Sequence, residues 1–221
     1  MFFLSAVVAG CAAVPKPLAG LVPGKEVETV QSAVAISIRT PEGNRGGRGF
    51  LVFKSPDRFH LAILSPFGLT LVDVFSDGDR LTCLIPSKDT AYSGLLSELP
   101  AREGLRSWAL MRWVVEKTPI AGPATERDHL TAAGRREKVY YDSRGLVVRK
   151  ETEDGDRVEF EDYHAYDGVA FPSVIELATA DGEDVRLTFD EPELNKPVDA
   201  SVLAPQLEGV TVLPFSAFKG F

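Results

Sequence analysis

The sequence predicts a mainly β protein of the α+β kind: a curved, antiparallel, half-open β-barrel with helices covering its apolar concave side. Short apolar or alternating runs recur along the chain, separated by turn signals rich in Pro, Gly, Asp and Asn. The loops between the runs are too short for parallel crossovers, so neighbouring strands should pair antiparallel. About ten or eleven strands are expected, which is too many for a flat open sheet of this size and favours strong curvature.

Composition indicates a folded domain and excludes several classes of function. The chain has 221 residues, of which 44% are hydrophobic, and this is enough for a substantial core and argues against disorder. The formal net charge of −8 argues against nucleic acid as a partner, because phosphate binding needs a positive surface. The two Cys and three His show no metal-ligand spacing, so no metal site is expected.

The N-terminal segment has the character of a bacterial lipoprotein signal. Residues 1–10 form an apolar run that is too short to span a bilayer and fits a secretory signal peptide, although no Lys or Arg lies in it. It ends in Val-Ala-Gly-Cys at 8–11, which resembles a lipobox and predicts a covalent lipid on Cys11. By analogy with bacterial sorting rules, Ala12 implies the outer membrane. Residues 11–23 should then form a lipidated, flexible tether; the alternative is a small apolar segment with an incidental Cys.

The folded domain is expected to span residues 24–221 and to begin with a sheet. A short helix over 24–32 leads into the alternating strand 34–39. Beyond it, apolar runs alternate with hairpin signals, which predicts consecutive antiparallel strands. The runs at 58–64 and 69–75 are apolar on both faces near the loop that joins them. This part of the sheet should therefore be covered on one side and line an apolar space on the other.

The loop between these two runs carries a phenylalanine where a turn is usually polar. Pro66 pre-sets its own φ and Gly68 tolerates positive φ, so the backbone can reverse and leave Phe67 at the tip. We predict that this loop, Pro66, Phe67, Gly68 and Leu69, contacts a membrane. The alternative is that Phe67 folds back onto its own strands.

The middle of the chain predicts a helix and the second half returns to strands. Residues 103–116 carry apolar side chains at helical spacing, including Trp108, and this amphipathic face should pack on the sheet. Phenylalanines near the C-terminus are expected to pack on the barrel, with cavity occlusion or lipid contact as alternatives. Further strands are predicted at 138–141, 146–149, 157–161, 174–177 and 185–189.

Residues suited to catalysis do not gather in any recognisable pattern, so we expect no enzyme, no catalytic residue and no cofactor apart from lipid on Cys11. Cys83 lies in an apolar strand, where a thiol is ordinary core. His60 and His164 lie among charged neighbours and are expected at the surface. The acidic run 151–156 lacks the spacing of a calcium loop and should be a solvated hairpin.

Taken together, these features resemble the outer-membrane lipoproteins of the LolB type, which are related to the periplasmic carrier LolA. The resemblance rests on the lipobox at Cys11, the strand, Ser-Pro-Phe-Gly and strand unit at 58–75, and the Leu105 and Trp108 pair on a helix. Phe171-Pro172 before a strand and Asn-Lys-Pro at 195–197 also match. The helix departs from the family pattern because it lacks the usual Gly at its end.

The resemblance implies a non-catalytic protein that holds acyl chains in an apolar cavity and helps receive lipoproteins and insert them into the outer membrane. The family's loop reads Pro-Leu-Gly, so its membrane-contact role carries over to Phe67. The implied partners are lipoprotein acyl chains, a LolA-type periplasmic carrier and the outer membrane, with the protein a lipid-anchored monomer facing the periplasm. The expected cavity-lining residues are Phe50, Val52, Phe59, Leu61, Ile63, Val74 and Trp108.

A second interpretation stays open at this point. The same barrel could be a packed scaffold in a structural or interaction lipoprotein of the cell envelope, without insertase activity. A solid barrel interior would favour this second interpretation, and an apolar cavity would favour lipoprotein handling.

Overall fold

The computed structural model describes residues 18–22, 25–40, 43–99, 105–117, 124–131 and 134–218, without the side chains of residues 105, 106, 108 and 109. The predicted signal peptide, the predicted lipidation site Cys11 and most of the predicted tether lie outside these described residues.

Within them, thirteen strands form one sheet, accompanied by one α-helix and four short 3₁₀ helices. The elements are β1 (Thr29–Thr40), β2 (Gly43–Lys54), β3 (Arg58–Leu64), β4 (Thr70–Asp77), β5 (Arg80–Ile85), η1 (Pro86–Lys88), β6 (Thr90–Leu95), η2 (Leu96–Glu98), α1 (Leu105–Val115), β7 (Glu126–Leu130), β8 (Arg136–Tyr141), β9 (Val147–Thr152), β10 (Arg157–Tyr166), β11 (Val169–Ala178), β12 (Asp184–Leu194), η3 (Ala200–Leu203), β13 (Thr211–Leu213) and η4 (Phe215–Ala217).

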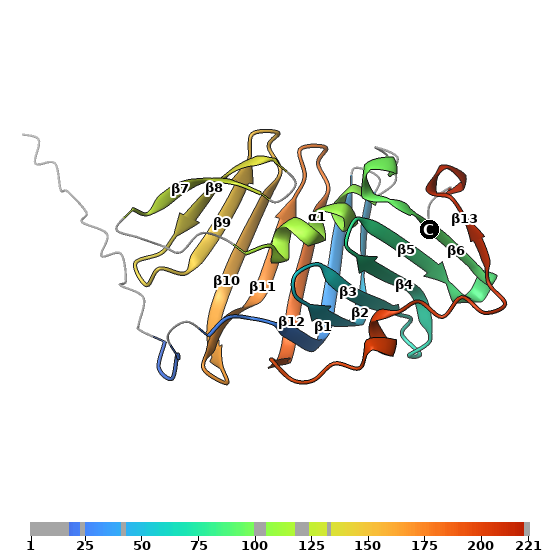
Figure 1. Cartoon of the computed structure of the whole chain (residues 1–221), viewed down its shortest axis with the longest axis horizontal. Coiled ribbons are helices and arrows are strands. Elements are labelled where there is room, and N and C mark those ends of the chain that lie inside the picture. Colours follow the sequence, from blue (N-terminus) through green and yellow to red (C-terminus); the bar gives the residue numbers. More distant parts are fainter. Residues whose placement is uncertain are drawn as a thin grey trace, which may run out of the picture.

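The sheet is strongly twisted and open, and its strands follow the order β13-β6-β5-β4-β3-β2-β1-β12-β11-β10-β9-β8-β7 (Figure 1). All neighbours pair antiparallel except β13, which pairs parallel with β6. The predicted mainly β, antiparallel class is therefore correct, but the predicted count of ten or eleven strands is too low. The expected cover of several helices is not confirmed, since the described residues contain a single α-helix. None of the described helices is long and apolar enough to cross a bilayer.

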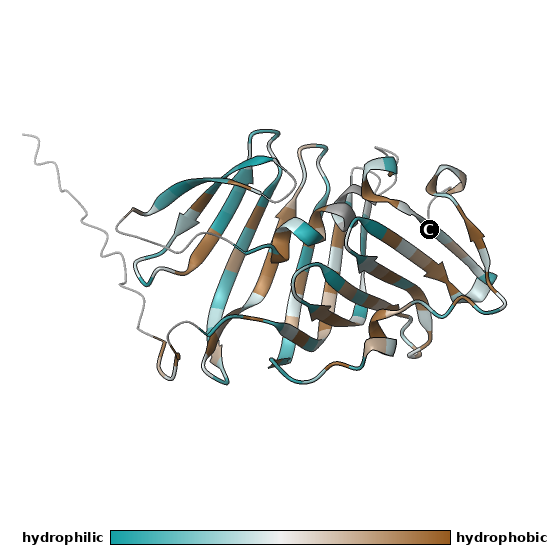
Figure 2. Cartoon of the chain, viewed as in Figure 1, coloured by the Kyte–Doolittle hydropathy of each residue, from teal (hydrophilic) through white to brown (hydrophobic). Residues whose placement is uncertain are grey.

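The main core lies on the face of the sheet that carries α1, which we call the inner face; the opposite face is the outer face. Figure 1 shows α1 lying across the middle of the sheet, and its buried Leu110, Met111, Trp113 and Val114 join one hydrophobic cluster with strand residues. Because side chains alternate between the two faces of each strand, the strand residues that point to the inner face join this cluster. Hydrophobic residues are frequent in β3 to β6, whereas hydrophilic ones are frequent in β7 to β9 (Figure 2). The two ends of the sheet therefore differ in hydropathy.

Local predictions at both ends of the domain had different outcomes. The short helix expected over 24–32 is wrong, because residues 25–28 form no regular structure and β1 begins at Thr29. Pairing of β1 with both β2 and β12 overrides the weak helical pattern. The helix expected over 103–116 is observed as α1. The expected packing of the C-terminal phenylalanines is confirmed for Phe215 and Phe218, both buried.

A glycine sets the close approach of β2 and β3. A Cβ added at Gly49 would lie 2.2 Å from the carbonyl oxygen of Ala62, which is far inside van der Waals contact. We expect Gly49→Ala to lower the free energy of unfolding by about 1–3 kcal/mol, as overpacking does. Chemical denaturation measures this change. Gly47→Ala is the control, since its added Cβ would meet nothing nearer than 3.7 Å; equal stability of the two variants would contradict the expectation.

Candidate functional site

An apolar cavity of about 190 Å³ lies between α1 and the inner face of the sheet. Its walls come from α1 and from strands β1, β2, β10, β11 and β12, and Tyr163 alone among the lining residues carries a side-chain polar group. Pockets for drug-sized ligands usually measure roughly 300–1,000 Å³, so this cavity is small. The lining residues are Val27, Val30, Leu51, Phe53, Met111, Val114, Val115, Phe160, Tyr163, Ala170, Phe171, Pro172, Ile175 and Phe189.

Helix α1 forms the roof of this cavity and is fixed at its C-terminal end by a buried lysine. Lys150, on β9, is 1% exposed, and its Nζ donates to the carbonyl oxygens of Trp113 and Glu116, both at 2.9 Å. The last carbonyls of a helix have no partner within the helix, and a cation there also balances the helix dipole. Burial lowers the pKa of Lys150 to about 8, while the Glu137 and Glu116 carboxylates act in the opposite direction.

A second polar contact holds the same end of α1. Glu137, on β8, is 4% exposed and accepts a hydrogen bond from Trp113 Nε1. Its other oxygen, Oε1, lies 2.5 Å from Nδ1 of His129. The Arg135 guanidinium lies over the Trp113 ring, 5.7 Å from its centroid. We call Lys150, Glu137 and His129 the polar anchor of α1.

Further contacts to α1, near its N-terminal end at Ser107 and in its last turn at Arg112, come from loops between strands. Ser107 Oγ donates to Glu183 Oε2 at 2.6 Å, and Arg112 forms ion pairs with Asp79 and Asp57. Asp79 is 78% exposed, and ion pairs at such sites contribute little to stability. Among the described side chains, α1 is therefore held near its N-terminal end by Ser107, which is 4% exposed, and in its last turn by Arg112 and the polar anchor.

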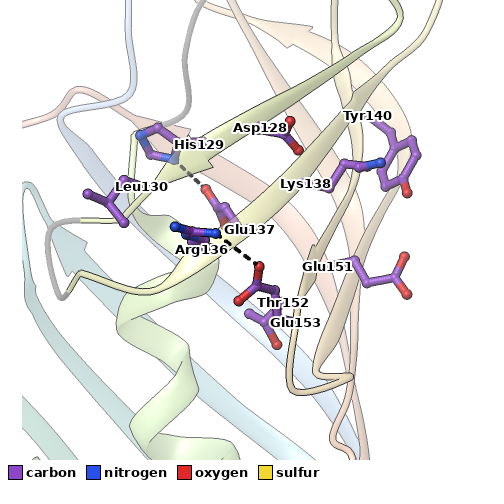
Figure 3. Close-up of a pocket in the computed structure, with 10 residues that line it drawn as sticks. All are labelled: Asp128, His129, Leu130, Arg136, Glu137, Lys138, Tyr140, Glu151, Thr152 and Glu153. Carbon is purple, nitrogen blue, oxygen red and sulfur yellow. Dashed lines mark hydrogen bonds and ion pairs between the residues drawn. The ribbon is translucent and has the colours of Figure 1, made fainter.

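A larger hollow of about 690 Å³ lies on β7, β8 and β9, and its character is polar (Figure 3). Side chains of both charges line it, among them Asp128, Lys138 and Glu151. Figure 3 shows Arg136 directed toward Glu153, with an ion-pair distance of 3.8 Å. No group of three or more potential metal ligands occurs among the described residues. The lining of this hollow does not suit an apolar ligand.

The β3–β4 loop protrudes as the sequence predicts. Gly68 has φ of +79°, its N–H donates to the Ser65 carbonyl at 2.9 Å, and Ser65 Oγ accepts from the Leu69 N–H at 3.1 Å. Pro66 is exposed, Phe67 is 90% exposed and Leu69 is 70% exposed. Phe67 therefore does not fold back onto its own strands, and the turn presents it to the surroundings.

The residues that the sequence assigned to a cavity divide between the two faces. Phe59, Leu61, Ile63 and Val74 lie on the inner face but pack in the core beside the cavity rather than along it. Phe50 and Val52 point to the outer face, because they alternate with the core residues of β2. The side chain of Trp108 lies outside the described residues.

The lining residues that sequence reasoning missed come from α1, β1, β2, β10, β11 and β12. On β2, Leu51 and Phe53 line the cavity, one residue out of phase with the expected pair. Both faces of β2 are apolar there, and period-2 alternation alone does not say which face is covered by the helix. The alternation at 185–189 and the aromatic Phe171, which lies in β11, were visible signals for the parts of the wall formed by β12 and β11.

Two residues considered for chemistry have structural roles. Cys83 is 1% exposed, and burial raises the pKa of its thiol to about 12, with the Asp73 carboxylate as a smaller cause. His60 was expected at the surface and is only partly exposed: 19% of its side chain is accessible, and Nε2 lies 2.7 Å from Asp73 Oδ1. Its ring also stacks on Phe75, with the centroids 4.1 Å apart. These neighbours hold His60 on the outer face of the sheet.

Comparison with known proteins identifies a matching family and structures with a similar fold. A family model described as outer membrane lipoprotein LolB matches residues 29–191. No curated protein sequence matches the chain. The fold resembles solved structures at low sequence identity, which supports the fold alone.

Three of these structures span most of the chain. A DUF1329 family protein from Desulfovibrio piger has a TM-score of 0.60 and 10% identity, covering 80% of this chain and 90% of its own. A LolA superfamily protein from Nitrosomonas europaea has a TM-score of 0.54 and 13% identity, covering 84% and 93%. A domain named as an outer membrane lipoprotein-sorting protein, from Vibrio parahaemolyticus, has a TM-score of 0.56 and 9% identity, covering 80% and 89%.

Proposed function

The chain belongs to the outer membrane lipoprotein LolB family, and from this premise we propose that it receives the acyl chains of lipoproteins in the cavity under α1 and helps insert them into the outer membrane. The family acts in lipoprotein localisation and is non-catalytic. The observation that carries the proposal is the apolar cavity between α1 and the inner face, lined almost wholly by hydrocarbon side chains. Each methylene buried there would contribute about 0.8 kcal/mol.

Acyl-chain uptake requires the cavity to enlarge. At about 190 Å³ it is below the usual size of a ligand pocket, so α1 has to move away from the sheet. Movement of the N-terminal end about the polar anchor would break the hydrogen bond between Ser107 and Glu183 and keep the buried contacts of Lys150 and Glu137. A mainly apolar wall and a movable roof suit a flexible hydrocarbon chain.

Delivery and anchoring are separate tasks in this proposal. Phe67 at the loop tip would enter the membrane, and burying one such side chain contributes roughly 1.5–3 kcal/mol, enough to dock a surface transiently. Stable attachment would come from lipid on Cys11 after removal of the signal peptide 1–10, with 11–23 as the tether. The protein would be a monomer on the periplasmic face of the outer membrane, receiving cargo from a LolA-type carrier.

A structural lipoprotein of the envelope is the second candidate. The small cavity volume favours it, because a packed interior suits a scaffold better than a carrier of acyl chains. In that case substitutions at the loop would disturb a protein contact and leave lipoprotein sorting unchanged.

A transfer assay separates the two candidates. A lipoprotein bound to its carrier is mixed with the protein and liposomes, and its appearance in the liposomes is followed. We expect Phe67→Glu to slow transfer by about tenfold or more, because a charged tip loses the roughly 1.5–3 kcal/mol of apolar burial. Leu130→Glu, at a 61% exposed position on β7, is the matched control and should transfer at the normal rate. Equal rates for both variants would argue for the structural candidate.

A further inference from the structure

An exposed apolar area continues from the β3–β4 loop onto the outer face of the sheet. Phe50 is 45% exposed and Leu71 is 48% exposed, and both side chains point outward on β2 and β4. The strand β3 lies between them: Ala62 pairs with Phe50, and a bulge after Ile63 leaves Leu71 outside the ladder. The membrane-contact loop alone does not account for these two exposed side chains.

Small side chains surround Phe50 on the outer face of the sheet. Its neighbours on β1 are Ala33, directly paired with it, and Ala35, both exposed and both with small side chains. Ala62 supplies another small neighbour on β3. A broad partner can therefore contact Phe50 without meeting bulky neighbours.

A positive charge borders the area next to the loop. Arg48 lies on the outer face of β2. It pairs with Leu64 on β3, the last residue before the loop, and with Ala35 on β1. Among the described residues it is exposed and has no ion-pair or hydrogen-bond partner. The nearest carboxylate on this face of β4, Asp73, lies 2.7 Å from His60. Arg48 is therefore available to a negative group outside a protein whose net charge is −8.

We propose that Phe50, Leu71 and Arg48, which we call the outer patch, form one docking surface together with the Phe67 loop, and that its partner is an anionic phospholipid bilayer. The inference rests on the proposed function, because it extends the membrane contact assigned to the loop. The protein then lies with the end of the outer face next to the loop against the bilayer, since Val52 and Phe75 farther along β2 and β4 are buried. In this pose Arg48 meets lipid phosphates while Phe50 and Leu71 enter the interfacial region.

Tryptophan scanning with brominated phospholipids tests the pose. The full chain, reconstituted in vesicles of phosphatidylethanolamine and phosphatidylglycerol with brominated acyl chains, carries Phe67→Trp, Leu71→Trp, Phe50→Trp or Leu130→Trp. We expect quenching and a blue shift of emission, relative to the unsubstituted chain, for the first three. No change is expected for Leu130→Trp, which lies on the edge strand β7 at a 61% exposed position.

Charge is tested in the same system. Arg48→Glu in the Leu71→Trp chain should reduce quenching about fivefold or more in vesicles with phosphatidylglycerol. The reason is that each basic residue near an anionic membrane surface strengthens membrane binding by about this factor. In vesicles of phosphatidylcholine alone the substitution should have little effect. Equal quenching with and without Arg48→Glu in the anionic vesicles would overturn the role of the charge.

Failure of the inference and failure of the proposed function give different results. Quenching of Phe67→Trp without Leu71→Trp or Phe50→Trp would overturn the docking surface and leave the loop contact intact. Quenching of none of the three would count against both. If the emission of Leu71→Trp shifts on addition of the carrier protein without lipid, the patch is a protein-docking surface and the lipid proposal is wrong.

Discussion

Ile175→Trp is expected to weaken acyl-chain binding by about tenfold or more while the protein still folds. Ile175 is 6% exposed on the inner face of β11 and lines the cavity under α1. An indole at this position would occupy the space of at least two methylenes of a bound chain, and each methylene contributes about 0.8 kcal/mol. Titration with a fluorescent fatty acid measures the affinity, and circular dichroism verifies the fold.

The control for this substitution places the same indole outside the cavity. Leu130→Trp, on the exposed edge strand β7, should bind the fatty acid with the affinity of the unsubstituted protein. Overpacking at Ile175 should itself cost about 1–3 kcal/mol of stability, so binding is compared at a temperature where both variants are folded. Unchanged affinity in Ile175→Trp would show that acyl chains bind elsewhere.

Glu137→Ala is expected to lower the free energy of unfolding by about 3–5 kcal/mol, the usual cost of breaking a buried charge pair. The substitution leaves the Trp113 indole N–H without its acceptor and removes the carboxylate that favours the charged form of Lys150. For a protein of this size the midpoint of thermal unfolding should fall by roughly 6–20 °C. Differential scanning calorimetry measures the shift.

Two further variants separate the charge from the hydrogen bond. Glu137→Gln keeps an acceptor for Trp113 and should destabilise less than Glu137→Ala. Glu153→Ala removes a carboxylate that is 71% exposed and lies 3.8 Å from Arg136, so it should change stability little. If Glu137→Ala were as stable as Glu153→Ala, the polar anchor would not hold α1.

The loop could be predicted from the sequence because its geometry depends on neighbouring residues alone. Pro66 and Gly68 dictate the reversal, and no distant contact is needed to expose Phe67. The helix α1 was also predictable within a few residues, since its apolar spacing runs over several turns. Antiparallel pairing could also be predicted locally, because the loops between neighbouring strands are too short for parallel crossovers.

The cavity wall and the polar anchor depend on contacts between distant parts of the chain. Both faces of β2 are apolar, so alternation could not say whether Phe50 or Leu51 faces α1. In the sequence, Lys150 and Glu137 resemble ordinary charged residues of solvated strands. Their roles depend on contacts with the C-terminal end of α1, which lies far from them in the sequence. The strand count was too low partly because β7 and β13 are short edge strands with weak patterns, formed by pairing with their neighbours.

Photocrosslinking of a bound acyl chain tests the central claim most directly. A lipoprotein with a photoreactive group in its acyl chain is delivered from a LolA-type carrier, irradiated, and the labelled peptides are identified by mass spectrometry. The proposal predicts labels on α1 at Met111 and Val114 and on β11 at Ile175, all of which line the cavity. Labels confined to the outer face, or no label above background, would contradict an acyl-chain site under α1.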